Sequence, residues 1–197
     1  IEPNVPDKHR LLDDFKRLSD MVGLNSIGWR YDPIFVSEKY TVERHVSDFE
    51  HMAKRLAGYT DTCVISFIDL YQKVKRNFPE AREVSREDRI TLAKEFVRIG
   101  KQYGITIKAC AEGTEFEVYG VDCDGCMTIS VYEKAIGCTL HAPKKKGARK
   151  ECSCVLGCDI GAYHTCGHLC RYCYANFDAD TVRKLLKLHS TRSWQQV

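Results

Sequence analysis

The sequence has few of the features that mark a membrane, secreted or strongly nucleic-acid-binding protein. Its 197 residues contain no apolar run of about 18 residues, the length a membrane-spanning helix needs. No positively charged start leads into an apolar stretch, so no secretory signal is recognised. The 30 Lys and Arg residues nearly balance the 27 Asp and Glu residues, and a net charge of +3 is too small to indicate nucleic acid by itself. We therefore expect a cytoplasmic chain with no membrane partner.

Common catalytic motifs are also missing, whereas cysteine is abundant. The chain has no phosphate-cradling glycine loop, no Ser/His/Asp arrangement and no HExxH helix. Of its 11 cysteines, Cys63 stands alone in an apolar segment and the others lie between Cys110 and Cys173. A disulfide scaffold would spread its bridges through the fold, whereas intracellular cysteine clusters are usually metal-binding or catalytic. We therefore favour metal ligation over disulfides and regard Cys63 as an ordinary core residue.

The first half of the chain alternates helical and strand patterns. Helices are predicted at residues 7–22, 42–57, 69–77 and 85–103, and strands at 26–31, 62–67 and 105–109. The apolar run at 62–67 is typical of a strand covered on both faces. The alternation predicts parallel βα units. The expected fold class is α/β, either an open doubly wound sheet or part of a (β/α) TIM-like barrel.

The second half has few apolar runs and many Gly and Cys residues. Two further helices are predicted there, at 127–136 and 179–189. Since so little apolar surface cannot form a core, metal ligation would have to order this part, and structural zinc supplies on the order of 10 kcal/mol to small peptides. We therefore expect a partial α/β barrel at residues 1–112 and a Cys-rich metal-binding segment with a closing helix at 113–197.

Polar residues follow each predicted strand. In parallel α/β folds, function sits at the carboxyl ends of the strands. Single Asp residues at such places also often cap helices or turns, and this alternative stays open for Asp32 and Asp69. The candidate catalytic residues at this rim are Arg30, Asp32, Asp69 and Glu112.

The most specific motif is a C-x3-C-x2-C sequence formed by Cys166, Cys170 and Cys173. Three thiolates this close can hold three corners of a [4Fe–4S] cluster and leave the fourth iron open. The spacing is that of radical S-adenosylmethionine enzymes, including the aromatic Tyr172 before the third cysteine. Tyr172 and Asn176 are candidate cofactor contacts, although Asn176 also suits a helix cap. The alternative is zinc, completed by a distant Cys, His164 or His168.

A second group of cysteines has the arrangement of a metal knuckle. It consists of one C-x2-C pair and one C-x-C pair with two further candidates: Cys123, Cys126, Cys152, Cys154, Cys158 and Cys110. The group could hold a zinc ion or a second iron–sulfur cluster, and the tight C-x-C pair favours a cluster slightly. Six candidates for four places leave at least two thiols outside the site.

A basic run occupies residues 144–150 beside this group. Short charge runs are usually solvated loops. Its position also suits attraction of an anionic substrate or of nucleic acid, but no aromatic residues interleave it, which weakens the nucleic-acid interpretation.

Several strings in the sequence resemble a bacterial family, domain-of-unknown-function family 1848. They include Trp29-Arg-Tyr-Asp-Pro33, Ser66-Phe-Ile-Asp-Leu-Tyr71, Cys110-Ala-Glu112, Asp159-Ile-Gly-Ala-Tyr163 and the C-terminal cysteine motif followed by Tyr174-Ala-Asn176. The resemblance covers almost the whole chain and implies a barrel-type fold related to radical S-adenosylmethionine proteins. It also implies an electron donor such as a ferredoxin or flavodoxin. Family members usually begin with roughly a hundred more residues, and a whole barrel needs about 250, so we expect a barrel that lacks its first strands.

These observations lead to two functional hypotheses. The first is a radical S-adenosylmethionine-like iron–sulfur enzyme that generates a radical on an unknown substrate. No Gly-Gly-Glu-like segment is present to hold the amino group of that cofactor. The second is a non-catalytic zinc or iron–sulfur protein that interacts with nucleic acid through residues 144–150.

Overall fold

The computed structural model describes residues 1–141, 152, 154–155, 161–176 and 178–192. The chain forms two compact units, and each is discontinuous in sequence. The sheet unit comprises Asp7–Ile68 and Arg82–Cys158, and the loop unit comprises Ile1–Pro6, Asp69–Ala81 and Asp159–Val197. Among the helices of the described residues, none is long and apolar enough to cross a membrane.

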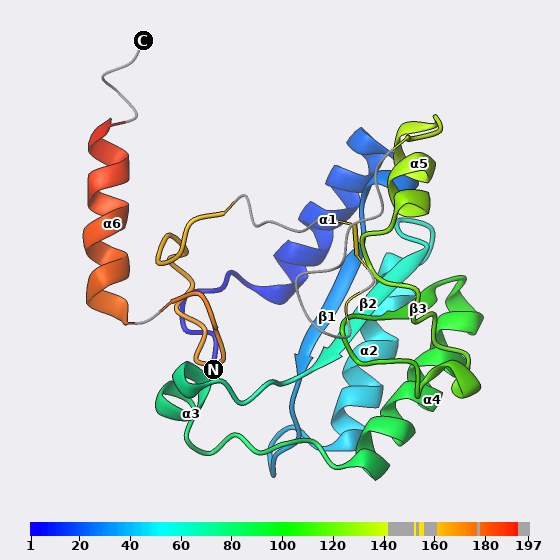
Figure 1. Cartoon of the computed structure of the whole chain (residues 1–197), viewed down its shortest axis with the longest axis horizontal. Coiled ribbons are helices and arrows are strands. Elements are labelled where there is room, and N and C mark those ends of the chain that lie inside the picture. The colour runs from blue at the N-terminus through cyan, green and yellow to red at the C-terminus, as the bar shows by residue number, and fades with distance from the viewer. Residues whose placement is uncertain (142–151, 153, 156–160, 177, 193–197) are drawn as a thin grey trace. The chain divides into compact units, whose positions relative to one another are not determined.

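The sheet unit is built on three parallel strands in the order β1-β2-β3 (Figure 1). The strands are β1 (Trp29–Ile34), β2 (Thr62–Phe67) and β3 (Thr106–Ala109). Arg30 pairs with Val64, and Val64 pairs with Lys108, so these three residues form one row across the sheet. Asp122 extends the sheet through a parallel bridge to Lys108. The mixed α/β class and the parallel βα units are therefore as predicted.

The helices of the sheet unit begin and end where local chemistry requires. They are α1 (Lys8–Val22), α2 (Val42–Leu56), α4 (Arg86–Tyr103) and α5 (Ile129–Ile136), with short 3-10 turns at Leu24–Ser26 and Glu117–Tyr119. The side chains of Asp7, Thr41, Ser85 and Thr128 accept backbone N–H groups at the four amino ends, as N-caps do. Gly104 ends α4 in the left-handed conformation that glycine adopts without strain.

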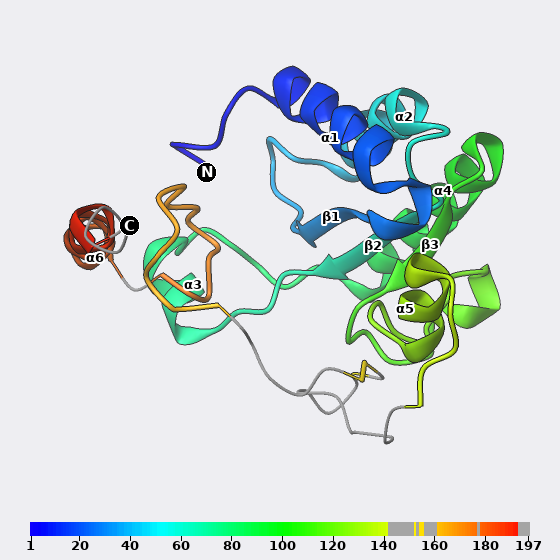
Figure 2. The ribbon, with the colours of Figure 1, turned by 90° about the horizontal axis from the view of Figure 1, so that it is seen from above.

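One face of the sheet carries the apolar core. Trp29 stacks on Phe49 of α2, and Phe49 stacks on Phe96 of α4, with ring centroids 4.8 and 4.0 Å apart. Tyr31 adds edge-to-face contacts with both phenylalanines. Cys63 points into the same core and is fully buried, as expected of a small apolar residue. Figure 2 shows α1 and α2 on one side of the sheet and α5 on the other.

The other face of the sheet is polar because side chains alternate along a strand. It carries Arg30, Val64 and Lys108 in one row, with Asp32, Ser66 and Cys110 two residues further on. Ser66 donates to Asp32 over 3.3 Å, and Lys108 forms an ion pair with Asp122. A parallel sheet buries both faces, so the polar residues on this side must find partners within the fold.

The loop unit contains α3 (Gln72–Asn77) and α6 (Ala179–Arg192). Its other described residues include the first six of the chain, the segments on either side of α3 and the cysteine-containing loop at 161–176. Arg171 of this loop forms a two-pronged ion pair with Glu80, over 2.6 and 2.8 Å, and donates to the Asn77 carbonyl. The guanidinium of Arg171 also lies 4.9 Å from the centre of the Phe78 ring. One arginine therefore joins the loop to the segment that follows α3.

Two expectations about the fold need revision. The described residues form a sheet of three strands and no barrel, so the TIM-like barrel is not seen in this part of the chain. The first strand begins at Trp29 instead of residue 26, because Leu24–Ser26 forms a 3-10 turn after Gly23 ends α1. The helices predicted at 69–77 and 127–136 begin later, at Gln72 and Ile129.

Candidate functional site

Three cysteine thiols meet on the polar face of the sheet unit. The sulfur of Cys126 lies 3.7 Å from that of Cys110 and 3.5 Å from that of Cys154. These three residues form a buried cluster with Val64 of β2, and Cys152 packs against it. We call Cys110, Cys126, Cys152 and Cys154 the thiol cluster.

Backbone pairing brings these cysteines together from three segments. Cys110 follows β3, and its N–H donates to the Ile65 carbonyl of β2 over 2.9 Å. Asp122 pairs with β3 and leads the chain back toward Cys126 on the polar face. The N–H of Val155 donates to the Met127 carbonyl over 2.9 Å, which fixes the Cys154 segment beside the Cys126 segment.

Arg30 is the cation of this site. It forms an ion pair with Asp32 over 2.6 Å and donates to the Cys126 sulfur over 3.7 Å. Burial alone would lower the pKa of Arg30, but the hydrogen bonds and charge of Asp32, together with Cys110, raise it above its usual range. The hydrogen bond with Cys110 lowers the pKa of Cys126, and the same contact together with burial raises the pKa of Cys110. The site therefore favours negative charge on Cys126.

Tyr132 of α5 adds a polar group that was not among the site residues predicted from the sequence. Its hydroxyl is buried and has no hydrogen-bond partner among the described residues. Burial, followed by the charges of Cys154 and Cys126, raises the pKa of Tyr132. The hydroxyl is thus an unused donor within electrostatic range of two thiols. A tyrosine six positions after Cys126 on a short helix is too general a pattern to predict this.

Not every cysteine predicted for this group joins the thiol cluster. Cys123 donates toward the Val121 carbonyl over 3.8 Å, and burial followed by the charge of Glu117 raises its pKa. Cys110, counted as a lesser candidate, belongs to the cluster and contacts its central thiol, Cys126. Cys158 and the basic run at 144–150 lie outside the described residues.

The C-x3-C-x2-C motif lies on a tightly held loop of the loop unit. Asn4 donates from its side chain to the Gly167 carbonyl over 2.8 Å and from its backbone to the His168 carbonyl over 3.3 Å. Leu169 adopts a φ of 56°, which is uncommon for a residue other than glycine. The Cys173 N–H donates to the Cys170 carbonyl over 3.0 Å. These contacts fix the backbone between the cysteines.

We call the three cysteines of this motif the triad, and two of them, Cys166 and Cys173, lie within electrostatic range of Cys170. Cys166 is exposed, whereas Cys170 and Cys173 are half-buried. Burial raises the pKa of Cys170, and the charges of Glu2, Cys173 and Cys166 add to the increase. Tyr172 donates its hydroxyl to Glu2, and burial together with this bond raises the pKa of Tyr172. Tyr172 therefore anchors the loop to the first residues of the chain.

Asn176 contacts the first cysteine of the triad, Cys166. Its side-chain nitrogen donates to the Cys166 carbonyl over 2.9 Å. The side-chain oxygen is buried and has no partner among the described residues, and the residue is only 6% exposed. Buried polar atoms are nearly always hydrogen-bonded, so this acceptor needs an explanation. The helix cap considered for Asn176 is instead supplied by Asp178, which accepts the Thr181 N–H over 2.8 Å.

The four predicted rim residues divide between different environments. Arg30 and Asp32 lie on the polar face beside the thiol cluster. Glu112 accepts the Phe67 N–H over 2.8 Å and pairs with Arg89 over 3.2 Å. Asp69 belongs to the loop unit, where it accepts the Tyr71 hydroxyl over 3.0 Å.

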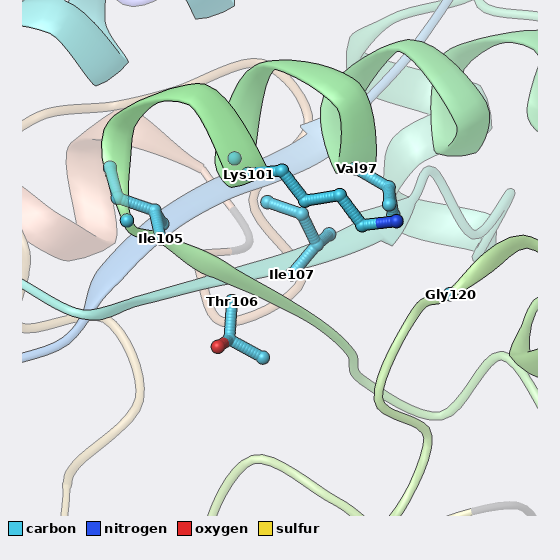
Figure 3. Close-up of a pocket in the computed structure, with 8 residues that line it drawn as sticks. Val97, Lys101, Ile105, Thr106, Ile107 and Gly120 are labelled. Carbon is cyan, nitrogen blue, oxygen red and sulfur yellow. The ribbon is translucent and has the colours of Figure 1, made fainter.

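Two further observations concern metal-ligating groups and cavities in the described structure. In the part of the chain that the structure describes, no group of three or more His, Cys, Asp and Glu side chains is placed so that it could hold a metal ion. A shallow depression of about 340 Å³ lies at the amino end of β3 (Figure 3). It is lined by apolar and backbone atoms with Lys101 across it, and it contains none of the predicted site residues.

Comparison with known proteins gives one match. A family described as a domain of unknown function, DUF1848, matches residues 1–175. The chain belongs to this family. The DUF1848 match includes both the thiol cluster and the triad and ends one residue before Asn176. No curated protein and no solved structure gives a significant match.

Proposed function

We propose that this DUF1848 protein is an iron–sulfur protein in which the triad holds a [4Fe–4S] cluster, with radical S-adenosylmethionine-like chemistry. The observation that carries the proposal is the unpartnered, buried oxygen of Asn176 beside the Cys166 carbonyl. It indicates that a hydrogen-bond donor is missing from the neighbourhood of the triad. The amino group of S-adenosylmethionine is such a donor.

The loop fits a cluster because its backbone is already satisfied. The carbonyls of Cys166, Gly167 and His168 accept hydrogen bonds from Asn176 and Asn4. Of the side chains that the loop carries, the three cysteines are the ligands that an iron–sulfur cluster takes. Each thiol that binds iron does so as a thiolate. The partial exposure of the triad leaves room for the inorganic part of the cluster and for an open iron.

Each residue would then have a defined task. Cys166, Cys170 and Cys173 would hold the cluster, and Asn176 would orient the amino group of the cofactor. Tyr172 and Arg171 would hold the loop in place through Glu2 and Glu80. When bound, S-adenosylmethionine would supply a 5′-deoxyadenosyl radical that removes a hydrogen atom from the substrate.

The proposal is tested by purifying the full chain without oxygen and counting iron. We expect about four irons per chain, with absorption near 400 nm. Cys170→Ala should lose this iron, and Cys138→Ala, which removes an exposed cysteine outside both groups, should keep it. Reduction in the presence of S-adenosylmethionine should release 5′-deoxyadenosine. A colourless chain that takes up no iron, or full iron content in Cys170→Ala, would refute the cluster.

Asn176→Ala separates the cofactor from the cluster. Since Asn176 contacts the loop through a backbone carbonyl, the variant should keep its iron. It should lose the change in the electron paramagnetic resonance signal that S-adenosylmethionine causes in the reduced chain. An unchanged response would remove Asn176 from the cofactor site but leave the cluster assignment intact.

A non-catalytic metal-binding protein is the second candidate function. The observation that favours it is the thiol cluster, where three cysteines and an arginine lie together. A chain that binds metal but releases no 5′-deoxyadenosine would support this candidate over the enzyme.

A further inference from the structure

Two sulfur–sulfur distances in the thiol cluster are close to those between the ligands of a tetrahedral zinc ion. A tetrahedral Zn²⁺ with zinc–sulfur bonds of about 2.3 Å holds its sulfur ligands about 3.8 Å apart. Cys126 lies 3.7 Å from Cys110 and 3.5 Å from Cys154. A cubane cluster, by contrast, binds each cysteine through a different iron and needs wider spacing.

The surroundings of the thiols supply what a thiolate site needs. Arg30 donates to the Cys126 sulfur, and the buried hydroxyl of Tyr132 has no partner in the described structure. Hydrogen bonds of this kind orient metal ligands and tune their charge. A disulfide between Cys126 and Cys154 would use two sulfurs and leave Cys110 and Cys152 without a role.

We propose that Cys110, Cys126, Cys154 and Cys152 bind one Zn²⁺ ion on the polar face of the sheet unit. Each protonated thiol that binds releases its proton to solvent, and no electron is transferred. Four thiolates and one Zn²⁺ leave a net charge of −2, and Arg30, which also pairs with Asp32, donates a hydrogen bond to one of the four sulfurs. As they stand among the described residues, these side chains are not placed to hold a metal ion, so binding requires the thiols to rearrange. This site is independent of the iron proposed for the triad.

The test is titration of the fully reduced chain with Co²⁺, followed by displacement with Zn²⁺. One equivalent of Co²⁺ should give the intense visible absorption of a tetrahedral cobalt thiolate, and Zn²⁺ should abolish it. Cys126→Ser should lose this equivalent. Cys63→Ser is the matched control, since its thiol lies on the opposite face of the sheet. A chain with its triad changed to serine should keep the full cobalt signal, which separates this site from the proposed cluster.

Tyr132→Phe keeps the test valid if Cys126→Ser does not fold. This variant removes only a hydroxyl, and loss of such a supporting group lowers metal affinity about 10- to 100-fold. Unchanged affinity would remove Tyr132 from the site. The proposal is overturned if the reduced chain binds no Co²⁺ in thiolate coordination, or if iron and sulfide assemble a cluster on Cys126.

Discussion

Glu112 fixes the end of β2 to α4. Its two carboxylate oxygens accept the Phe67 N–H and the Arg89 guanidinium, and its side chain is only 9% exposed. Glu112→Ala would leave the Phe67 N–H without its acceptor and Arg89 without its nearer carboxylate partner, which we expect to lower the free energy of unfolding by about 2 kcal/mol. Glu95→Ala breaks an exposed pair with Arg98 and should change it by less than about 1 kcal/mol. Urea unfolding compares the two, and equal stability would contradict a structural role for Glu112.

His45 makes the stability of the sheet unit depend on pH. Its ring lies between the Tyr31 hydroxyl and the Phe35 carbonyl, both at 2.8 Å, and burial is the main reason that its pKa is lowered. The unfolded chain, with the ordinary histidine pKa of about 6.5, then binds this proton more readily than the folded chain does. We expect the contribution of His45 to the free energy of unfolding to have its full value above pH ~6.5. This contribution should be lost as the pH falls through the lowered pKa of folded His45.

The measurement for His45 is chemical unfolding at several pH values in the native chain and in two variants. His45→Gln cannot take up the proton, so its stability should change less with pH over the same range. His51→Gln removes an exposed histidine of the same helix and should keep the native pH profile. Identical profiles for native chain and His45→Gln would show that another group controls the dependence.

At the scale of elements, the sequence predicts what local chemistry determines. Helix α4 begins after Ser85 and ends at Gly104 because a cap and a left-handed glycine mark both ends. The strand predicted at 62–67 is confirmed, because an apolar run of this length is typical of a strand covered on both faces. The first strand is displaced by three residues, since nothing in its pattern distinguishes the 3-10 turn at Leu24–Ser26 from a strand.

The membership of the thiol cluster could not be predicted in the same way. Spacing groups Cys123 with Cys126, but the structure pairs Cys126 with Cys110. The reason is that side chains alternate along β3, so Cys110 lies on the same face of the sheet as Lys108. Lys108 stands in one row with Arg30, and Cys110 lies two residues beyond that row. Which residues of the neighbouring strands lie beside Cys110 depends on strand register, and register is a property of the folded sheet.

At the scale of the whole molecule, each proposed metal site draws its ligands from one compact unit. The triad belongs entirely to the loop unit, and the thiol cluster belongs entirely to the sheet unit. No ligand is shared, so a change at one site should leave the loading of the other unaltered. Energetic effects at separate sites without common partners usually add.

Independent loading is therefore a prediction that elemental analysis can test in one set of proteins. Changing the three triad cysteines to serine should remove the iron and keep the zinc. Changing Cys126 and Cys154 to serine should remove the zinc and keep the iron, and the combined variant should lose both. Because metal binding contributes directly to folding, the decreases in melting temperature should also be additive. Loss of both metals from either single-site variant would show that the two units fold as one cooperative structure.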